Sequence, residues 1–378
     1  MPPQPLFPPD PGYRYTRRHF LQGAGTTVAA LTLANCRANL TGQTTTPDNS
    51  SSGGKNTLHI YTWSNYIDQD TVTAFTDQTG VKVIFDIFDS NEVMLTKLQS
   101  GGGNAYSLIY PSDYMVTQMV DLGMLTALDP DRLPGIKNLK SRWANPGYDP
   151  NNAHSMPFST GTTGLVYSRE VTPGVPEDWE FLWQASPQIS RRFTLLDDTR
   201  EVLGATLKSL GYSYNTNDAT QIEAAYRKLL ALKPHIAAFK SGGFEDEILA
   251  GDLAVAMAYS ADAIPLTRQD TNLAYLIPRS GTSLWTDTMA IPTTAPNPEA
   301  AYQWINFMLE PEVARVTAER FLFSTVNQAA FEQLPPELQN NRNLYPEEEV
   351  LDRSEGIAPL ATASNDLFDR FWTEITSA

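Results

Sequence analysis

The chain has 378 residues, of which 41% are hydrophobic, and it carries 43 acidic residues against 27 lysines and arginines. This length predicts two or three units of domain size, and no apolar run reaches the roughly 18 residues that a membrane-spanning helix needs, so the body is not expected to be embedded in a membrane. The net charge of −16 argues against a nucleic-acid partner, because nucleic acids are bound by basic surfaces. An acidic surface attracts cations, although the simpler interpretation is that it keeps the protein soluble.

Residues 1–36 have the features of an export signal and are excluded from the fold. The paired Arg17 and Arg18 precede a Phe-Leu pair, and an alanine-rich apolar run follows. This pattern predicts a twin-arginine signal that sends the protein to the periplasm, with an amphipathic N-terminal helix as the alternative. The next segment, 37–55, is small and polar, which predicts a flexible tether or a plain disordered terminus.

Cys36 is the only cysteine, which excludes an intrachain disulfide and a cluster of thiolate metal ligands. Its setting, Leu-Ala-Asn-Cys, resembles a bacterial lipobox, in which the thiol receives a lipid and becomes the new N-terminus. Asn35 departs from the glycine, alanine or serine that usually precedes that cysteine. The hypothesis is a membrane tether through lipidated Cys36, and the alternative is a cysteine lying incidentally in or near a signal that is cleaved elsewhere.

From residue 57 onwards, the hydrophobic pattern alternates between strand and helix. Alternating and β-branched stretches predict strands at 57–62, 81–88 and 106–111. Apolar residues at helical spacing predict helices at 69–79, 91–102 and 112–124, with Gly80 as a stop and Asn91 as an N-cap. Repeated strand–helix units predict an α/β fold built on a parallel sheet with helices on its faces.

A second set of elements follows the same pattern. Strands are predicted at 164–168, 192–197, 253–260, 272–278 and 288–292. Helices are predicted at 199–211, 220–233 and 298–309, the last of them opened by a proline in its first turn.

The sequence lacks the phosphate-binding loop, the dinucleotide-binding fingerprint and the nucleophile elbow that mark common enzyme classes. Its four histidines are scattered without the spacing of a metal site, so no metal or cofactor is predicted. Asp197, Asp198 and Glu201 could supply paired carboxylates for glycoside hydrolysis, but carboxylates are too common for this to be a specific signal. Acids with this spacing at a helix start also form a capping pattern, and capping is the preferred interpretation of Asp198 and Glu201 taken alone.

Aromatic side chains lie beside small polar or acidic residues at several predicted strand ends: Trp63 and Tyr66, Ser112 and Tyr114, Tyr259 and Asp262, and Trp285 and Asp287. Any one of these aromatics alone is best explained as a half-buried core residue. Several together at strand tips, where α/β proteins meet their ligands, favour a binding site. Indole and phenol faces attract cations by roughly 2 kcal/mol or more when dry, and carboxylates form charge-assisted hydrogen bonds to ammonium groups. The pattern predicts a flexible aliphatic cation whose amines meet the acidic residues.

Longer stretches extend this pattern into a family resemblance. The segments "TLHIYTWSNYI", "TGVKVIFDIFDSNEVMLTKL", "YPSDYMVTQM", "LLDDTREVLGATLKSLGYSYNT", "LWTDTMAIP" and "PEAAYQWINFMLEPEVA" resemble the spermidine/putrescine-binding periplasmic proteins of ABC importers. The resemblance implies a two-lobed type II periplasmic-binding-protein fold with a hinge, whose lobes close over a ligand in the cleft between them. It implies a monomer that binds a polyamine without chemistry and delivers it to a membrane permease driven by a separate ATPase. The expected lobes are 57–162 plus 274–332 and 163–273 plus 333–378.

The resemblance also implies which residues contact the polyamine. The aromatic walls would be Trp63, Tyr66, Tyr114 and Trp285, with Ser64 and Ser112 as polar contacts. Asp198 and Glu201 would meet amines, Asp287 would anchor an amine, and Ser241 would be a further contact.

Three positions depart from the family pattern. Tyr259 stands where spermidine binders often have tryptophan, Phe323 stands where they have tyrosine, and Ile357 lies near the place of a glutamine contact. Asp262 instead resembles an acid of putrescine-preferring relatives. The choice among amines is therefore open. The alternatives are another organic cation, an amino acid or a ferric complex in the same clamp, or a secreted hydrolase that uses its carboxylates.

Overall fold

A computed structural model describes residues 56–64 and 66–377. The predicted export signal, the tether and Cys36 lie outside these described residues. Within the described part of the chain, no helix is both long and apolar enough to cross a membrane.

The strands form one mixed ten-stranded sheet in the described part of the chain, in the order β2-β1-β3-β9-β4-β7-β5-β6, with β8 and β10 also paired to β4. Their bounds are Thr57–Thr62 (β1), Lys82–Ile87 (β2), Leu108–Ile109 (β3), Ser155–Ser168 (β4), Phe193–Leu195 (β5), Ala238–Phe239 (β6), Val255–Tyr259 (β7), Leu273–Leu276 (β8), Leu284–Ala290 (β9) and Ser324–Thr325 (β10). The predicted parallel pairing is confirmed for β1 with β2 and β3 and for β5 with β6 and β7. The sheet as a whole is mixed, because β4 runs antiparallel to β7, β8, β9 and β10.

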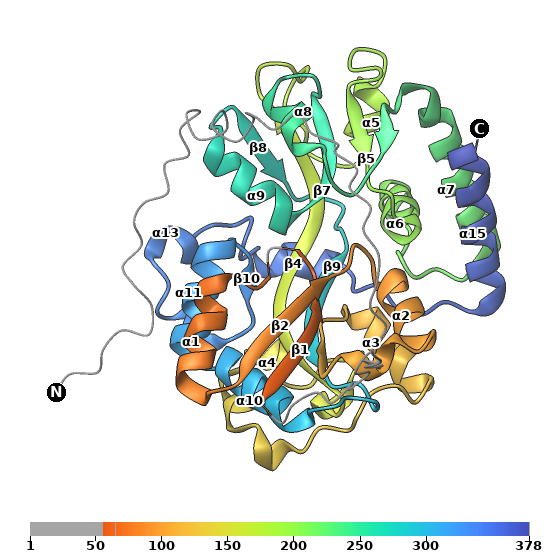
Figure 1. Cartoon of the computed structure of the whole chain (residues 1–378). Coiled ribbons are helices and arrows are strands. Elements are labelled where there is room, and N and C mark those ends of the chain that lie inside the picture. The colour runs from red at the N-terminus through yellow and green to blue at the C-terminus, as the bar shows by residue number, and fades with distance from the viewer. Residues whose placement is uncertain (1–55, 65, 378) are drawn as a thin grey trace, which may run out of the picture. The chain divides into compact units, whose positions relative to one another are not determined.

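The long strand β4 joins two sections of this sheet. Residues 155–162 pair with β9, whereas residues 163–168 pair with β7 and β8. Figure 1 shows β4 running from the section that contains β1, β2 and β9 into the section that contains β5 and β7. The prediction had found only its second half, 164–168. The first half is rich in serine, threonine, glycine and proline, and it is a strand because it pairs with β9.

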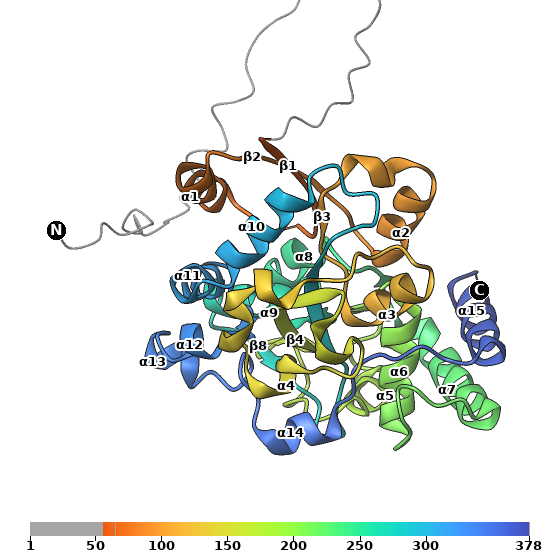
Figure 2. The ribbon, with the colours of Figure 1, turned by 90° about the horizontal axis from the view of Figure 1, so that it is seen from below.

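The helices cover both faces of the sheet. Their bounds are Gln69–Thr79 (α1), Asn91–Gln99 (α2), Asp113–Asp121 (α3), Ser141–Ala144 (α4), Phe181–Ala185 (α5), Thr199–Ser209 (α6), Ala219–Leu232 (α7), Glu245–Leu249 (α8), Ser260–Gln269 (α9), Pro298–Met308 (α10), Pro311–Phe321 (α11), Gln328–Phe331 (α12), Pro336–Gln339 (α13), Glu348–Arg353 (α14) and Thr362–Ser377 (α15). Seen from below, α1 and α10 lie on one side of β1 and β3, and α2 and α3 lie on the other (Figure 2). In the second section, α7 packs on α15 through the stacked rings of Tyr226 and Phe371, whose centroids are 4.2 Å apart.

The helix ends explain where the elements stop and start. Gly80 ends α1 in the left-handed region at a φ of 73°, where its N–H bonds the Thr76 carbonyl, as predicted. The N-cap predicted for α2 was wrong by one residue: Ser90 accepts a bond from the Val93 N–H at 3.2 Å. Asn91 does not cap the helix; its side-chain amide donates to the Ser112 hydroxyl at 3.0 Å.

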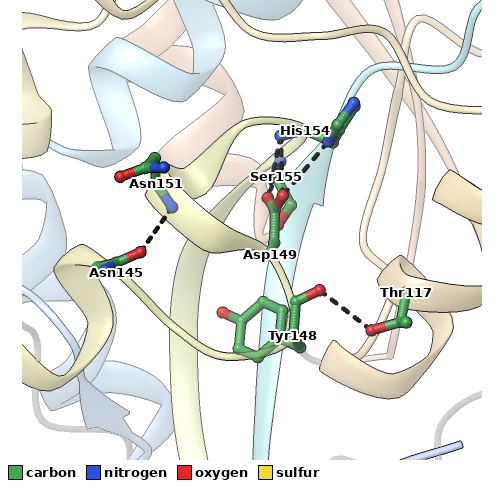
Figure 3. Close-up of polar contacts among 7 residues, drawn as sticks. All are labelled: Thr117, Asn145, Tyr148, Asp149, Asn151, His154 and Ser155. Atoms are coloured by element: carbon green, nitrogen blue, oxygen red, sulfur yellow. Dashed lines mark hydrogen bonds and ion pairs between the residues drawn. The ribbon is translucent and has the colours of Figure 1, made fainter.

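The loop before β4 is fixed by a buried carboxylate. Asp149 accepts bonds from the N–H of His154 and from both the N–H and the hydroxyl of Ser155, at 2.7 to 3.2 Å (Figure 3). Thr117 of α3 donates to the Tyr148 carbonyl at 3.1 Å. These bonds fix the start of β4 relative to α3, and α3 carries two of the predicted ligand residues at its N-terminus.

Candidate ligand-binding site

A cleft of about 1070 Å³ opens at the strand ends, lined by side chains from both sections of the sheet. Its volume lies at the upper end of the range of small-molecule sites. Twelve of the thirteen predicted contacts line it: Trp63, Ser64, Tyr66, Ser112, Tyr114, Asp198, Glu201, Ser241, Tyr259, Asp262, Trp285 and Asp287. Residues that are more than 200 positions apart in the sequence therefore share one cavity.

Asp287 lies at one end of the cleft, on β9, and is 6% exposed. Its carboxylate accepts hydrogen bonds from the hydroxyl of Tyr66 and, at 2.6 Å, from that of Ser112. An isolated bridge between the backbones of Ser112 and Asp287 holds this contact in register. Burial raises the pKa of Asp287 to about 6, and the two hydroxyl donors oppose that rise by stabilising the anion. The geometry suits a carboxylate that remains charged at neutral pH.

The aromatic walls come from different strands. Trp63 follows β1 and meets Phe88 edge to face, with ring centroids 4.4 Å apart. Trp285 on β9 meets Tyr259 at the end of β7 at 90° and 6.3 Å. The Trp285 ring lies over its cross-strand partner Gly161, where an added Cβ would be 2.1 Å from the indole Cζ2. Glycine at 161 therefore leaves the space that the tryptophan ring needs.

At the other end of the cleft, Asp198 caps α6. Its carboxylate accepts the Glu201 N–H at 3.0 Å, and its second oxygen lies 3.4 Å from the Tyr259 hydroxyl. The capping interpretation of Asp198 is thereby confirmed. Burial raises its pKa, and the negative charge of Glu92, which also lines the cleft, adds to the rise.

The side chain of Glu201 bonds Ser283 and does not take the capping role that its spacing predicted. It is 2% exposed, and its carboxylate accepts the Ser283 hydroxyl at 2.7 Å. The hydroxyls of Ser283 and Thr163 also lie 2.8 Å apart, so Ser283 links Glu201 of α6 to strand β4. Burial and the charge of Asp198 raise the pKa of Glu201 to about 8. Glu201 is consequently a structural tie as well as part of the cleft lining.

Ser241 and Asp262 complete the second wall. The Ser241 hydroxyl accepts the Asp197 N–H at 3.1 Å, which orders the turn before α6. Asp262 lies in the first turn of α9, where burial and the charge of Glu245 raise its pKa to about 7.

Phe323 does not line this cleft, in contrast to its predicted role. Its ring is 3% exposed and packs against Tyr66 at 5.7 Å and against Phe158 at 5.2 Å. A ring without a hydroxyl is stable in this apolar cluster, and it supports Tyr66 from behind. Ile357, the third departure, does line the cleft.

Acidic side chains dominate the charged lining. The carboxylates are those of Asp89, Glu92, Asp113, Asp121, Asp197, Asp198, Glu201, Glu245, Asp262, Asp287 and Asp369. Among the lining residues that the structure describes, the one basic side chain is Arg200, whose guanidinium donates to the Ala358 carbonyl and to Asn215 at 3.0 to 3.1 Å.

The buried carboxylates of the cleft form no ion pair with the protein. In the part of the chain that the structure describes, no ion pair includes Asp113, Glu201 or Asp287, nor the half-buried Asp198 and Asp262. In the same residues, no group of histidine, cysteine, aspartate and glutamate side chains is arranged to hold a metal ion. Arg200 is the one lining cation and acts electrostatically on Asp198 and Glu201, so an organic cation would supply the countercharge that is missing chiefly at Asp113 and Asp287.

Sequence reasoning missed Asp113, Asn91 and Glu92. Asn91 also donates to the Tyr114 hydroxyl at 3.1 Å, and that hydroxyl donates to Glu92 at 3.0 Å. Asp113 could have been found from the sequence, because it is an acidic residue between two predicted contacts, Ser112 and Tyr114.

Residues 70–346 match the family of bacterial extracellular solute-binding proteins. The chain belongs to this family. The spermidine/putrescine-binding periplasmic protein of Salmonella typhimurium is 37% identical to this solute-binding protein over 300 residues, which are 79% of this chain and 86% of the relative. The putrescine-binding periplasmic protein SpuD of Pseudomonas aeruginosa is 30% identical over 372 residues, 93% of this chain and 98% of the relative. The resemblance seen in the sequence is thereby confirmed.

Solved structures agree with these relatives. The spermidine/putrescine ABC transporter substrate-binding protein PotD of Streptococcus pneumoniae superposes on this solute-binding protein with a TM-score of 0.77 and 35% identity, over 85% of this chain and 99% of the other. The predicted fold class, a two-lobed α/β periplasmic-binding-protein fold, is confirmed by this match. The two relatives are named as periplasmic binding proteins, and the solved structure is named as an ABC transporter substrate-binding protein.

Proposed function

We propose that this solute-binding protein captures a polyamine of the putrescine or spermidine type in its cleft and delivers it to the permease of an ABC importer. The observation that carries the proposal is the set of buried carboxylates without an ion-pair partner, Asp113, Glu201 and Asp287, placed beside indole and phenol faces in one cavity. A flexible aliphatic chain with ammonium groups matches both features. The names of the relatives support this choice of ligand.

The energetics are adequate for a useful affinity. A micromolar complex needs about −8.2 kcal/mol. Charge-assisted hydrogen bonds contribute roughly 1.5–3 kcal/mol each, and aromatic contact with a desolvated cation adds roughly 2 kcal/mol. Two or three ammonium contacts at Asp287 and Asp198 with stacking on Trp285 reach this range after the cost of ordering the ligand.

The division into lobes is part of the proposal. We place 57–162 and 284–332 in one lobe and 163–276 in the other, since β8 pairs with the half of β4 that also pairs with β7. The C-terminal segment is divided between the two lobes. The Tyr345 hydroxyl accepts the Thr325 N–H at 3.2 Å, which favours the first lobe for the segment before α14. The buried ring of Phe368 packs in the core built by β5, β7 and α6, which favours the second lobe for α15.

Binding without catalysis fits the carboxylates best. In the hydrolase alternative, Asp198 and Glu201 would act on a substrate, yet Asp198 caps a helix and Glu201 is tied to Ser283. We further propose a monomer that works in the periplasm after twin-arginine export, with a membrane tether if Cys36 is lipidated.

Calorimetric titration of the purified protein with putrescine, spermidine, spermine, 4-aminobutyrate and glutamate tests the function. The expected result is saturable one-to-one binding of at least one amine, with weak or absent binding of the two amino acids. If only an amino acid gives a saturable binding heat, the cleft binds an amino acid and not a polyamine. Steady turnover of an added glycoside or ester would support the hydrolase alternative instead.

A further inference from the structure

Asp113 is the buried carboxylate in the cleft that the predicted contacts leave unexplained. It is 5% exposed, lines the cavity and lies in the first turn of α3. An acid at a helix N-terminus is favourable in any protein, because it faces the positive end of the helix dipole. Two further features of Asp113 go beyond that general role: its bond to another element and its proximity to other carboxylates.

The bond links α3 to β9. One Asp113 oxygen accepts the N–H of its neighbour Tyr114 at 2.8 Å, and the other accepts the N–H of Thr286 at 3.2 Å. Asp113 stands between Ser112 and Tyr114, and Thr286 stands between Trp285 and Asp287. This single side chain therefore joins the backbone stretches that carry four of the predicted ligand contacts.

The surroundings of Asp113 are acidic on several sides. Burial raises its pKa to about 8, and the negative charge of Asp287 on β9 adds to the rise. From α6, Glu201 is coupled electrostatically to Asp113, and from the loop before β4 the phenol of Tyr148 is coupled to it. Gly356 approaches from the C-terminal segment, where an added Cβ would be 3.9 Å from the Asp113 carboxylate. None of the ion pairs in the described residues includes Asp113, so its environment favours a positive charge nearby.

We infer that Asp113 is a positioning residue for ammonium recognition: it holds the start of α3 against β9 and places a second carboxylate behind the Asp287 anchor. This inference rests on the proposed function, because only a cationic ligand makes a second carboxylate useful there. A neutral amide at 113 keeps the length and one acceptor oxygen and loses the charge. Alanine loses both the bond to Thr286 and the charge.

The test compares wild type, Asp113→Asn, Asp113→Ala and Asp77→Asn by calorimetric titration with putrescine and spermidine between pH 6 and pH 8.5. Asp77 is exposed on α1 and is not among the residues that line the cleft, so it reports the effect of removing an acidic charge elsewhere on the protein. We expect Asp113→Ala to weaken binding at least tenfold and Asp113→Asn about threefold. We also expect the rise of affinity with pH to be shallower in Asp113→Asn than in wild type, whereas Asp77→Asn keeps the wild-type pH profile.

The outcomes separate the inference from the function. If Asp113→Asn binds with wild-type affinity and the wild-type pH profile, Asp113 only caps the helix and the inference fails while wild type still binds. If Asp113→Asn binds more weakly but keeps the wild-type profile, the role is packing alone and the inference also fails. If Asp113→Ala does not fold, the affinity and pH profile of Asp113→Asn alone test the inference. If the wild-type protein binds neither putrescine nor spermidine, the proposed function itself is wrong.

Discussion

The two ends of the cleft hold their carboxylates in different ways. At the β9 end, the carboxylate of Asp287 accepts the hydroxyls of Tyr66 and Ser112, and it caps no helix. At the α6 end, Asp198 holds a helix N–H and Glu201 holds Ser283. In the proposed function, the carboxylate at the β9 end therefore serves mainly the ligand, whereas those at the α6 end would combine ligand contact with the stability of the fold. Substitutions at the two ends should separate affinity from stability.

The largest effect on affinity is expected for Asp287→Asn. The amide keeps the shape but removes the charge that would pair with a buried ammonium group, which should weaken putrescine binding by about a hundredfold, or roughly 2.7 kcal/mol. The free energy of unfolding without ligand should change little. Calorimetry and urea unfolding measure the two quantities, and Asp77→Asn on the exposed face of α1 is the matched control. Retained affinity would remove Asp287 from the site.

Gly161→Ala should affect both quantities, because it disturbs the strand that joins the two sheet sections. The added methyl group would meet the Trp285 ring at 2.1 Å and the Ser260 hydroxyl at 2.3 Å, so the tryptophan has to move. Overpacking of this kind costs about 1–3 kcal/mol of stability, and the displaced wall should weaken amine binding about tenfold. Gly147→Ala, where the structure leaves open space around the new methyl, is the control. Unchanged near-ultraviolet circular dichroism in Gly161→Ala would contradict the packing argument.

A pair of substitutions at Asp198 separates its two roles. Asp198→Asn keeps an N-cap acceptor, because asparagine caps about as well as aspartate, so it should reduce affinity about fivefold without loss of stability. Asp198→Ala removes the cap as well and should lower the free energy of unfolding by about 1 kcal/mol. Equal stability of the two variants would show that the cap contributes nothing here.

The sequence predicted the residues that line the cleft better than the strand that organises them. Trp63, Tyr114 and Trp285 could be found because aromatics beside polar residues at strand ends are a local signal. The first half of β4 could not, because its serines, glycine and proline are typical of a loop, and only pairing with β9 makes it a strand. The position of Phe323 also depends on tertiary packing, since a phenylalanine can face a cleft or support its wall equally well.

Asp113 also shows that local sequence patterns do not predict tertiary contacts. Its place between Ser112 and Tyr114 was visible in the sequence, but its bond to Thr286 joins residues 173 positions apart. Local patterns carry no information about such a contact. The N-cap of α2 shows how small the error can be: Ser90 and Asn91 are both good caps, and the competing bond from Asn91 to Ser112 decides between them.

The final prediction concerns pH and has the smallest effect per group. Burial raises the pKa of Asp113 and Glu201 to about 8, of Asp262 to about 7 and of Asp287 to about 6. Between their unfolded values near 4 and these folded values, the folded protein holds protons that the unfolded chain has released. Their contribution to stability is therefore fully present below about pH 4 and is lost as the pH rises towards 8.

A bound ammonium group should reverse this trend, because it favours the ionised carboxylates and releases their protons. We expect putrescine to raise the unfolding temperature more at pH 8 than at pH 6, and proton release on binding to appear as a dependence of the calorimetric heat on the ionisation enthalpy of the buffer. Glu201→Gln, which stays neutral throughout, should show a flatter stability profile than wild type without ligand. A ligand-induced stabilisation that is the same at pH 6 and at pH 8, without proton release, would mean that the amines bind carboxylates already ionised in the free protein. Burial would then not hold the carboxylates of the free cleft neutral.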